Sequence, residues 1–591
     1  MQQPETSGPG GLPPLGTSTR NDPTVRRAAV VYGAIAVISI PLAVYSFGLN
    51  GSGFLSNLPT ATADLSFSFT RMLIAYCLSL GFALAYGYYA STHRTGERVM
   101  IPVLDILQSV PILGFFPVAI VFFVALTPGS PVGENLASIF LIFTSMAWNM
   151  VFGVYESLKT LPNELREAAD SFGARGFQRL RRVVLPATVN RLVYNSVLSW
   201  TAGWFFLVEA EIFTTSGTSP LPGIGSYLSI AASGGGAGAF LAGLLPLIVL
   251  IVLLDIGVWR PLGRWAERFR YDQTSAGQSI AERTTEGPRR FRRAAAYVTR
   301  GVRSGVTRMS SPFVQLAAFT SRATRERARK PFVRTAVHYV ALGTLLVIVW
   351  LMLIALGVAV YDVFSGTIAP SVRGQIVLLP LAMGASTLRV VTAYLLCLAI
   401  ALPLAAYLAR SPRAARGGLP MVEIIASFPA TALFPVIIFQ LVPYITPEGA
   451  ALLMLMTGMI WYLFFNLLAG IRSVPPDLEE AARSFGLDRR KMFRRVVLPG
   501  TLTALVTGSI TAFGGGWNTL IVAEYLQGGP GHLFQVFGIG QQIDLGYAEP
   551  NGLGLPLMTA ALLVLVATVI AINELIWKPL YRKSIDRYRY D

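Results

Sequence analysis

Charged residues, cysteine and histidine are all scarce in this chain, and each scarcity excludes a class of protein. Only 13% of the residues are charged, whereas about a quarter are charged in a soluble domain, so a soluble fold is excluded. The two cysteines, Cys77 and Cys397, lie in apolar segments and build no disulfide framework. The three histidines lack metal-ligand spacing, and no GxxxxGK(S/T) phosphate loop occurs. We therefore expect neither an enzyme nor a bound cofactor.

Apolar residues make up 53% of the chain and fall into blocks of about twenty. A helix of that length crosses a hydrocarbon core of about 30 Å at about 1.5 Å per residue. The blocks lie at 29–48, 70–92, 101–126, 137–157, 187–212, 239–261, 335–360, 386–409, 420–442, 449–471, 500–526 and 555–578. Strand-like alternation is missing, so the sequence predicts an all-α membrane protein with about twelve transmembrane helices.

Basic residues mark one side of the membrane. Most of the net charge of +17 lies between Arg260 and Arg334, and the loop after every second span is also basic. Loops on the opposite side, such as 127–136 and 443–448, carry almost no Lys or Arg. The positive-inside rule therefore places both termini in the cytoplasm. We assign the charge to orientation and to contact with anionic membrane lipid, and not to nucleic acid.

The chain contains an internal duplication. Placing Trp148 on Trp461 aligns residues 145–211 with 458–524 without a gap, which shared apolar composition alone would not produce. Both halves begin and end on the cytoplasmic side, so we predict two parallel six-helix repeats with a substrate path between them. The expected units are a disordered tail at 1–27, repeat 1 at 28–262, a basic linker at 263–333, repeat 2 at 334–580 and a tail at 581–591.

The longest match lies in a cytoplasmic loop of each repeat. Proline near its start and glycine at its end predict a short helix with one apolar face. Such a helix fits a groove on a partner protein, and the alternative is a helix lying on the lipid surface. The matched residues are Glu167, Ala168, Ala169, Gly173, Leu185 and Pro186 in the first repeat and Glu480, Ala481, Ala482, Gly486, Leu498 and Pro499 in the second.

This spacing of Glu-Ala-Ala, Gly and Leu-Pro resembles the signature loop of the inner-membrane permeases of binding-protein-dependent ABC importers. The resemblance implies a type I importer fold whose loops couple to a homodimer of ATPase subunits, which carry ATP and Mg. It also implies an extracytoplasmic substrate-binding protein and a bacterial or archaeal plasma membrane. An ion-driven secondary transporter with two parallel repeats is the alternative, although it needs no docking helix.

A second pattern narrows the resemblance to a subset of these permeases. The segments WFFLVEAE at 204–211 and WNTLIVAE at 517–524 are each followed by Gly-Ile-Gly, at 223–225 and 538–540. They are most similar to permeases for nitrate, sulfonates and taurine, which implies import of a small inorganic or organic anion. The repeats differ within these segments, where Phe205, Phe206 and Glu209 align with Asn518, Thr519 and Val522. We therefore predict an asymmetric substrate path.

Ionisable residues are rare and costly in membrane spans, so those that occur at matching positions of both repeats need a reason. We predict that Arg71 pairs with Glu211, and Arg389 with Glu524, to hold an outer gate that leaves arginine donors facing the path. The alternative is that each arginine snorkels to the interface and each glutamate faces water. Two aromatic side chains, Trp204 and Trp517, are candidates to line the path or to anchor the helices at the interface.

Overall fold

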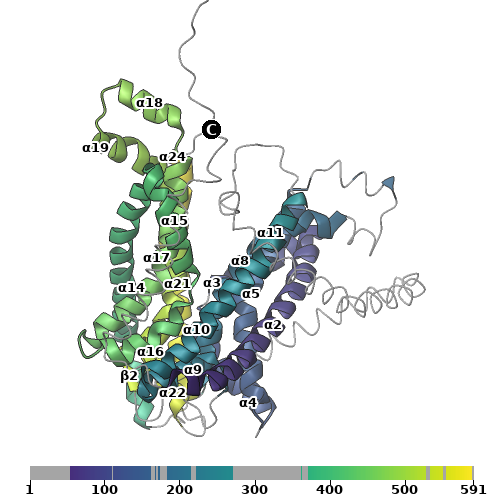
Figure 1. The fold of residues 1–591 in the computed structure, drawn as a ribbon, viewed down its shortest axis with the longest axis vertical. Coiled ribbons are helices and arrows are strands. Elements are labelled where there is room, and N and C mark those ends of the chain that lie inside the picture. The colour runs from purple at the N-terminus through teal and green to yellow at the C-terminus, as the bar shows by residue number, and fades with distance from the viewer. Residues whose placement is uncertain are drawn as a thin grey trace, which may run out of the picture.

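The computed structural model describes residues 53–109, 111–128, 130–161, 167, 171–172, 183–214, 221–269, 361, 370–527, 533–549 and 554–588. Helices make up nearly all of this described part (Figure 1). Its only strands are β1 (Tyr525–Gln527) and β2 (Leu533–Gln535), which pair antiparallel with Leu526 opposite Phe534. The predicted all-α fold is therefore confirmed.

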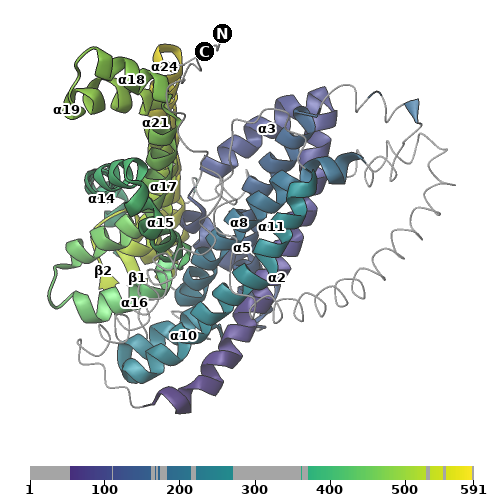
Figure 2. The ribbon, with the colours of Figure 1, turned by 45° about the horizontal axis from the view of Figure 1, so that its top comes forward.

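Two parallel repeats of helices follow one another along the chain and lie side by side in both views (Figures 1 and 2). The first contains α2 (Phe54–Thr92), α3 (Arg94–Ser109), η2 (Ile112–Phe115), α4 (Phe116–Leu126), α5 (Val132–Lys159), α8 (Leu185–Thr214), α9 (Ile224–Ile230), η4 (Ala231–Gly235), α10 (Gly236–Leu254), η5 (Asp255–Trp259), α11 (Arg260–Ala266) and η6 (Glu267–Phe269). The second contains α14 (Pro370–Arg410), α15 (Pro412–Ser427), η8 (Ala430–Leu433), α16 (Phe434–Val436), η9 (Ile437–Leu441), α17 (Pro447–Ser473), α18 (Pro476–Ser484), α19 (Arg489–Met492), η10 (Phe493–Val497), α20 (Leu498–Gly500), α21 (Leu502–Glu524), α22 (Ile539–Ala548), α23 (Leu555–Ile572), η12 (Asn573–Trp577) and α24 (Lys578–Tyr588). Helices α9 and α22 lie at one end of the molecule and α18 lies at the other (Figure 1).

Six helices of the described part are long and apolar enough to cross a membrane, or seven if one pair bent by 62° counts as a span. The six are Phe54–Thr92, Val132–Lys159, Gly236–Ala266, Gly374–Arg410, Pro447–Ser473 and Leu555–Asp586, and the bent pair is Arg490–Gly500 with Leu502–Glu524. Their positions agree with the predicted blocks. The predicted spans 29–48 and 335–360 and residues 270–333 of the predicted linker lie outside the described residues.

Two predicted spans are not continuous helices, which corrects the prediction for 101–126 and 420–442. In the first repeat α3 ends at Ser109, Pro111 is extended, and η2 and α4 follow. In the second repeat α15 ends at Ser427, and Pro429 is again extended ahead of η8. Proline has no backbone N–H and disfavours helix in the residue before it, so the chain breaks at the same place in both repeats.

Each break packs against the other repeat. η2 contacts α21, and η8 contacts α8. The side-chain oxygen of Asn518 on α21 accepts hydrogen bonds from the N–H of Ile112 at 2.6 Å and of Leu113 at 3.4 Å. In the reciprocal contact the Thr431 hydroxyl donates to the carbonyl of Phe205 at 3.4 Å. The two contacts between the repeats therefore lie at equivalent positions. In one a side-chain oxygen accepts from the backbone, and in the other a hydroxyl donates to it.

Replacing Asn518 by Leu is expected to destabilise the protein by about 1–3 kcal/mol, because two partly buried N–H groups lose their acceptor. The measurement is the free energy of unfolding in mixed detergent micelles. Thr431→Val is the matched control, and its effect is expected to be smaller because the Phe205 carbonyl lies within a helix that supplies its own donors. A larger loss from Thr431→Val than from Asn518→Leu would contradict this account.

Candidate functional site

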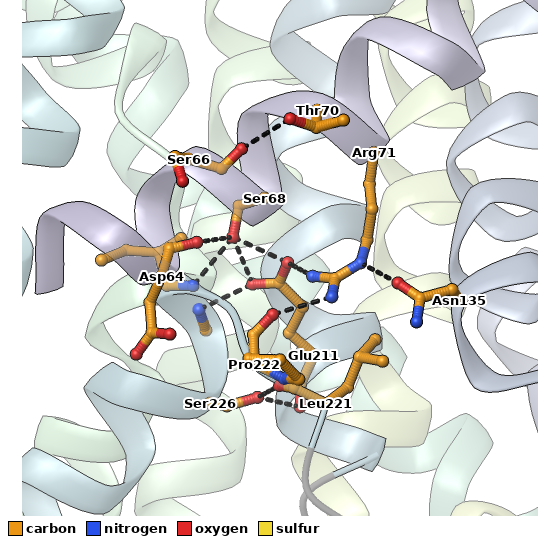
Figure 3. Close-up of polar contacts among 12 residues, drawn as sticks. Asp64, Ser66, Ser68, Thr70, Arg71, Asn135, Glu211, Leu221, Pro222 and Ser226 are labelled. Carbon is orange, nitrogen blue, oxygen red and sulfur yellow. Dashed lines mark hydrogen bonds and ion pairs between the residues drawn. The ribbon is translucent and has the colours of Figure 1, made fainter. Parts of the chain in front are cut away.

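A buried ion pair joins three helices of the first repeat at the end that carries α9. Arg71 on α2 and Glu211 on α8 are 4% and 0% exposed, and the Nη1–Oε1 distance is 2.6 Å (Figure 3). The Ser68 hydroxyl lies 2.7 and 2.9 Å from the two carboxylate oxygens. From the first turn of α9 the N–H of Gly225 donates to Glu211 Oε2 at 2.9 Å. The predicted pairing is therefore observed, and the alternative of a solvent-facing Arg71 and Glu211 is wrong.

The remaining nitrogens of Arg71 also have protein partners. Nε donates to Oδ1 of Asn135 at 2.8 Å, and Nη2 donates to the carbonyl of Pro222 at 2.7 Å (Figure 3). Each nitrogen of the guanidinium thus has one protein acceptor, and it stays a prediction that the arginine also leaves donors facing a path. These three bonds reach three separate elements, so Arg71 on α2 is joined to α8, to α5 and to the segment just before α9.

The second repeat contains the same arrangement with one more charge. Arg389 on α14 forms an ion pair with Glu524 on α21, and Ser386 donates to that carboxylate at 2.6 Å. The N–H of Gly540 on α22 donates to Glu524 Oε2 at 2.7 Å. Glu448 stands where the first repeat has Asn135 and receives two hydrogen bonds from Arg389, each 2.9 Å long. Because the Glu448 side chain is 58% exposed, it adds a negative charge at the surface beside the second pair.

The Gly-Ile-Gly segments are explained by close approach to these carboxylates. A Cβ on Gly223 would lie 2.3 Å from Cδ of Glu211, and one on Gly225 would lie 2.4 Å from the carbonyl oxygen of Val208. A Cβ on Gly538 would likewise lie 2.2 Å from Cδ of Glu524. Only a residue without a side chain lets the start of α9 or α22 deliver an N–H to the buried carboxylate.

The two tryptophans lie inside the helix packing. Trp204 is 2% exposed and packs edge-on against Trp200 with ring centroids 6.4 Å apart, and Trp517 is 3% exposed. An anchor at the membrane interface would show more exposed surface. In this conformation neither ring faces open solvent, and a role in lining the path stays a prediction.

The cytoplasmic loop of the second repeat contains the predicted short helix. α18 covers Pro476–Ser484, and Gly486 ends it with a left-handed φ of 74°, which favours glycine. Glu480 and Ala481 are exposed, and Ala482 is 7% exposed. The Ser473 hydroxyl donates to the Gly470 carbonyl, and α18 has no side-chain cap at its start. Leu498 and Pro499 form α20, which leads into α21.

The corresponding loop of the first repeat is described only in part. Glu167 is exposed, and Leu185 and Pro186 begin α8, whereas Ala168, Ala169 and Gly173 lie outside the described residues. Phe172 is 89% exposed, and its counterpart Phe485 is 84% exposed. Both loops therefore present a bare aromatic ring next to the Glu-Ala-Ala segment.

Sequence reasoning missed several residues that complete the buried sites. Ser68 and Ser386 stand three positions before the two arginines, and that shared spacing was available as a signal. Asn135 gave no such signal because the repeats differ at its position, where the second has Glu448. Among the described residues no group of three or more His, Cys, Asp or Glu could hold a metal ion.

Comparison with known proteins assigns both repeats to one family. Residues 77–258 and 398–577 each match the model described as "Binding-protein-dependent transport system inner membrane component". The glycine betaine/proline betaine transport system permease protein of Escherichia coli (strain K12) is 32% identical over 29% of this chain and 48% of its own length. The nitrate import permease protein of Leptolyngbya laminosa is 30% identical over 19% of this chain and 39% of its own length. The taurine transport system permease protein of Escherichia coli (strain K12) is 28% identical over 34% of this chain and 68% of its own length. The chain thus spans about half the length of the first of these relatives.

Proposed function

The chain belongs to the family of binding-protein-dependent transport system inner membrane components, and on that premise we propose that it is the membrane-spanning subunit of an ATP-driven importer. It is a multi-pass membrane protein with two permease repeats. A homodimer of separate ATPase subunits carries ATP and Mg, and a separate extracytoplasmic protein delivers the substrate. The protein resides in a bacterial or archaeal plasma membrane with both termini in the cytoplasm, as the basic loops indicate.

The observation that carries this proposal is the duplicated loop with an exposed aromatic ring. In the second repeat α18 projects beyond the helical bundle (Figure 1), and Phe485 at its end is 84% exposed. Arg410 holds the base of the loop, since its guanidinium lies 3.7 Å from Glu479 and 5.4 Å from the ring of Phe493. A fixed helix that points an apolar ring away from its own fold suits a groove on a partner. The coupling residues are Glu167, Ala168, Ala169, Gly173, Leu185, Pro186, Glu480, Ala481, Ala482, Gly486, Leu498 and Pro499.

The proposed substrate is a small inorganic or organic anion. Relatives of this chain are named for nitrate, aliphatic sulfonates and taurine. The outer gate of the path includes the pairs Arg71–Glu211 and Arg389–Glu524, because each joins helices at the end of the molecule opposite α18. In the open state of this gate the path is lined by Trp204 on α8 and Trp517 on α21, the two helices that also carry the paired glutamates.

Reversing the charge of both coupling loops tests the proposal. We expect Glu167→Lys combined with Glu480→Lys to weaken binding of the ATPase subunits by at least about tenfold, because both glutamates are exposed beside the docking surface. The measurements are co-purification of the ATPase with the chain and ATP-dependent uptake into vesicles that contain the complete assembly.

Glu267→Lys is the control, since it adds the same charge to an exposed position at the cytoplasmic end of the first repeat, outside both loops. It is expected to leave ATPase binding unchanged. Retention of the ATPase by the double variant would contradict the coupling assignment. Uptake driven by an ion gradient with no ATPase present would instead support the secondary transporter, which is the alternative function.

A further inference from the structure

One face of α8 is turned toward the second repeat. Phe205 and Phe213 lie eight positions apart and share that face because four residues make about one turn of helix. The ring of Phe205 is 6.4 Å from the ring of Phe434, and the ring of Phe213 is 5.5 Å from the ring of Tyr547. Glu209 lies midway between these two contacts, so its side chain projects onto the inter-repeat face.

The carboxylate of Glu209 is buried without a partner. The residue is 1% exposed, and neither carboxylate oxygen has a hydrogen-bond partner in the part of the chain that the structure describes. Its neighbour Glu211, on the other side of the same helix, is fully paired with Arg71 and Ser68. An unpaired buried carboxylate is strongly unfavourable, and such a group in a native fold requires an explanation.

The duplication shows that the fold does not need this carboxylate. The equivalent residue of the second repeat is Val522, which is 4% exposed on the same helix position of α21. The opposing helix α22 adds Asp544, a further buried carboxylate at 4% exposed, one turn before Tyr547. No described lysine or arginine forms an ion pair with Glu209 or Asp544. The inter-repeat face therefore holds two buried carboxyl groups and is lined by aromatic rings.

We propose that this face binds a positively charged amino or quaternary ammonium group of the transported molecule. The carboxylate of Glu209 supplies the countercharge, and the rings of Phe205, Phe213, Phe434 and Tyr547 supply cation–π contacts. This inference rests on the proposed import function and narrows it: the substrate is a small anion that also carries a cationic group. The repeats separate during transport to admit it, and Glu209 is the contact that only the first repeat provides.

The test compares two probes that share one anionic group. ATP-dependent uptake of 2-aminoethanesulfonate and of ethanesulfonate is measured in vesicles that hold the complete assembly with its own binding protein. We expect Glu209→Gln to reduce uptake of the amino compound by about tenfold or more and to change uptake of ethanesulfonate by less than about twofold. Glu156→Gln removes an exposed carboxylate near the C-terminal end of α5, and it is expected to leave uptake of both compounds unchanged.

Three outcomes overturn the inference. Equal loss of both substrates in Glu209→Gln would make Glu209 a structural residue. Transport of ethanesulfonate but not of the amino compound by the unaltered protein would show that no cationic group is recognised, with the importer function intact. Absence of ATP-dependent uptake of these probes and of nitrate would remove the proposed function and this inference with it. If Glu209→Gln does not accumulate in the membrane, Glu209→Val, which copies the second repeat, replaces it.

Discussion

Glu211→Gln is expected to destabilise the protein by about 3–5 kcal/mol, the usual effect of removing one partner of a buried ion pair. Arg71 is 4% exposed and would keep its charge inside the fold without a carboxylate to balance it. The same side chain also accepts from Ser68 and Gly225, so the loss loosens α2 and α9 together. The measurement is the free energy of unfolding in mixed micelles, with the amount of folded protein in the membrane as a second readout.

The control for this prediction is the double variant Arg71→Met with Glu211→Gln. Removing both charges leaves no unpaired ion, so the double variant is expected to lose less stability than the sum of the two single variants. Additive losses would contradict a direct coupling between Arg71 and Glu211. A charge swap is a poorer test, because an arginine at position 211 would face the N–H of Gly225.

The pairing of charges could be predicted from the sequence because duplication made it visible. Arg71 aligns with Arg389 and Glu211 with Glu524, and a costly ion that occurs twice at matching positions needs a partner. The direction in which each guanidinium points could not be predicted. It depends on acceptors such as Asn135 and the Pro222 carbonyl, which are remote in sequence and show no charge pattern.

The breaks at Pro111 and Pro429, in contrast, could not be predicted from the sequence. Apolar composition runs through 101–126 and 420–442, and proline is tolerated inside membrane helices, so the sequence favours one continuous span. The backbone instead breaks in both repeats, and in the first repeat the freed N–H groups of Ile112 and Leu113 find an acceptor on the other repeat, the Asn518 side chain. The hydropathy of a segment indicates that it lies in apolar surroundings. It does not indicate which remote side chain can accept a hydrogen bond from its freed backbone N–H groups.

One difference between the repeats lies where the structure brings the two repeats together. Asn518 and Phe205 occupy equivalent positions and make opposite kinds of contact, one polar and one aromatic. Another difference, Glu448 in place of Asn135, lies at the exposed edge of the second ion pair. The shared Arg, Glu and Ser residues therefore build the buried ion pair of each repeat, and residues that differ change the contacts around it and between the repeats.

Gly223→Ala is expected to cost about 1–3 kcal/mol or more, because it overpacks the site of the buried ion pair. The new Cβ would lie 2.3 Å from Cδ of Glu211, so the carboxylate must leave Arg71 or the start of α9 must move. Unfolding in mixed micelles measures the loss, and reduced uptake by the assembly is expected to accompany it.

Gly81→Ala on α2 provides the matched control for this substitution. A Cβ there meets nothing within 4 Å, so the change is expected to be neutral or to stabilise the helix by about 0.5–1 kcal/mol. In an Arg71→Met, Glu211→Ala background the penalty of Gly223→Ala is expected to fall, because the carboxylate that opposes the methyl group is gone. An unchanged penalty in that background would mean that Gly223 serves the backbone of α9 itself and not the approach to Glu211.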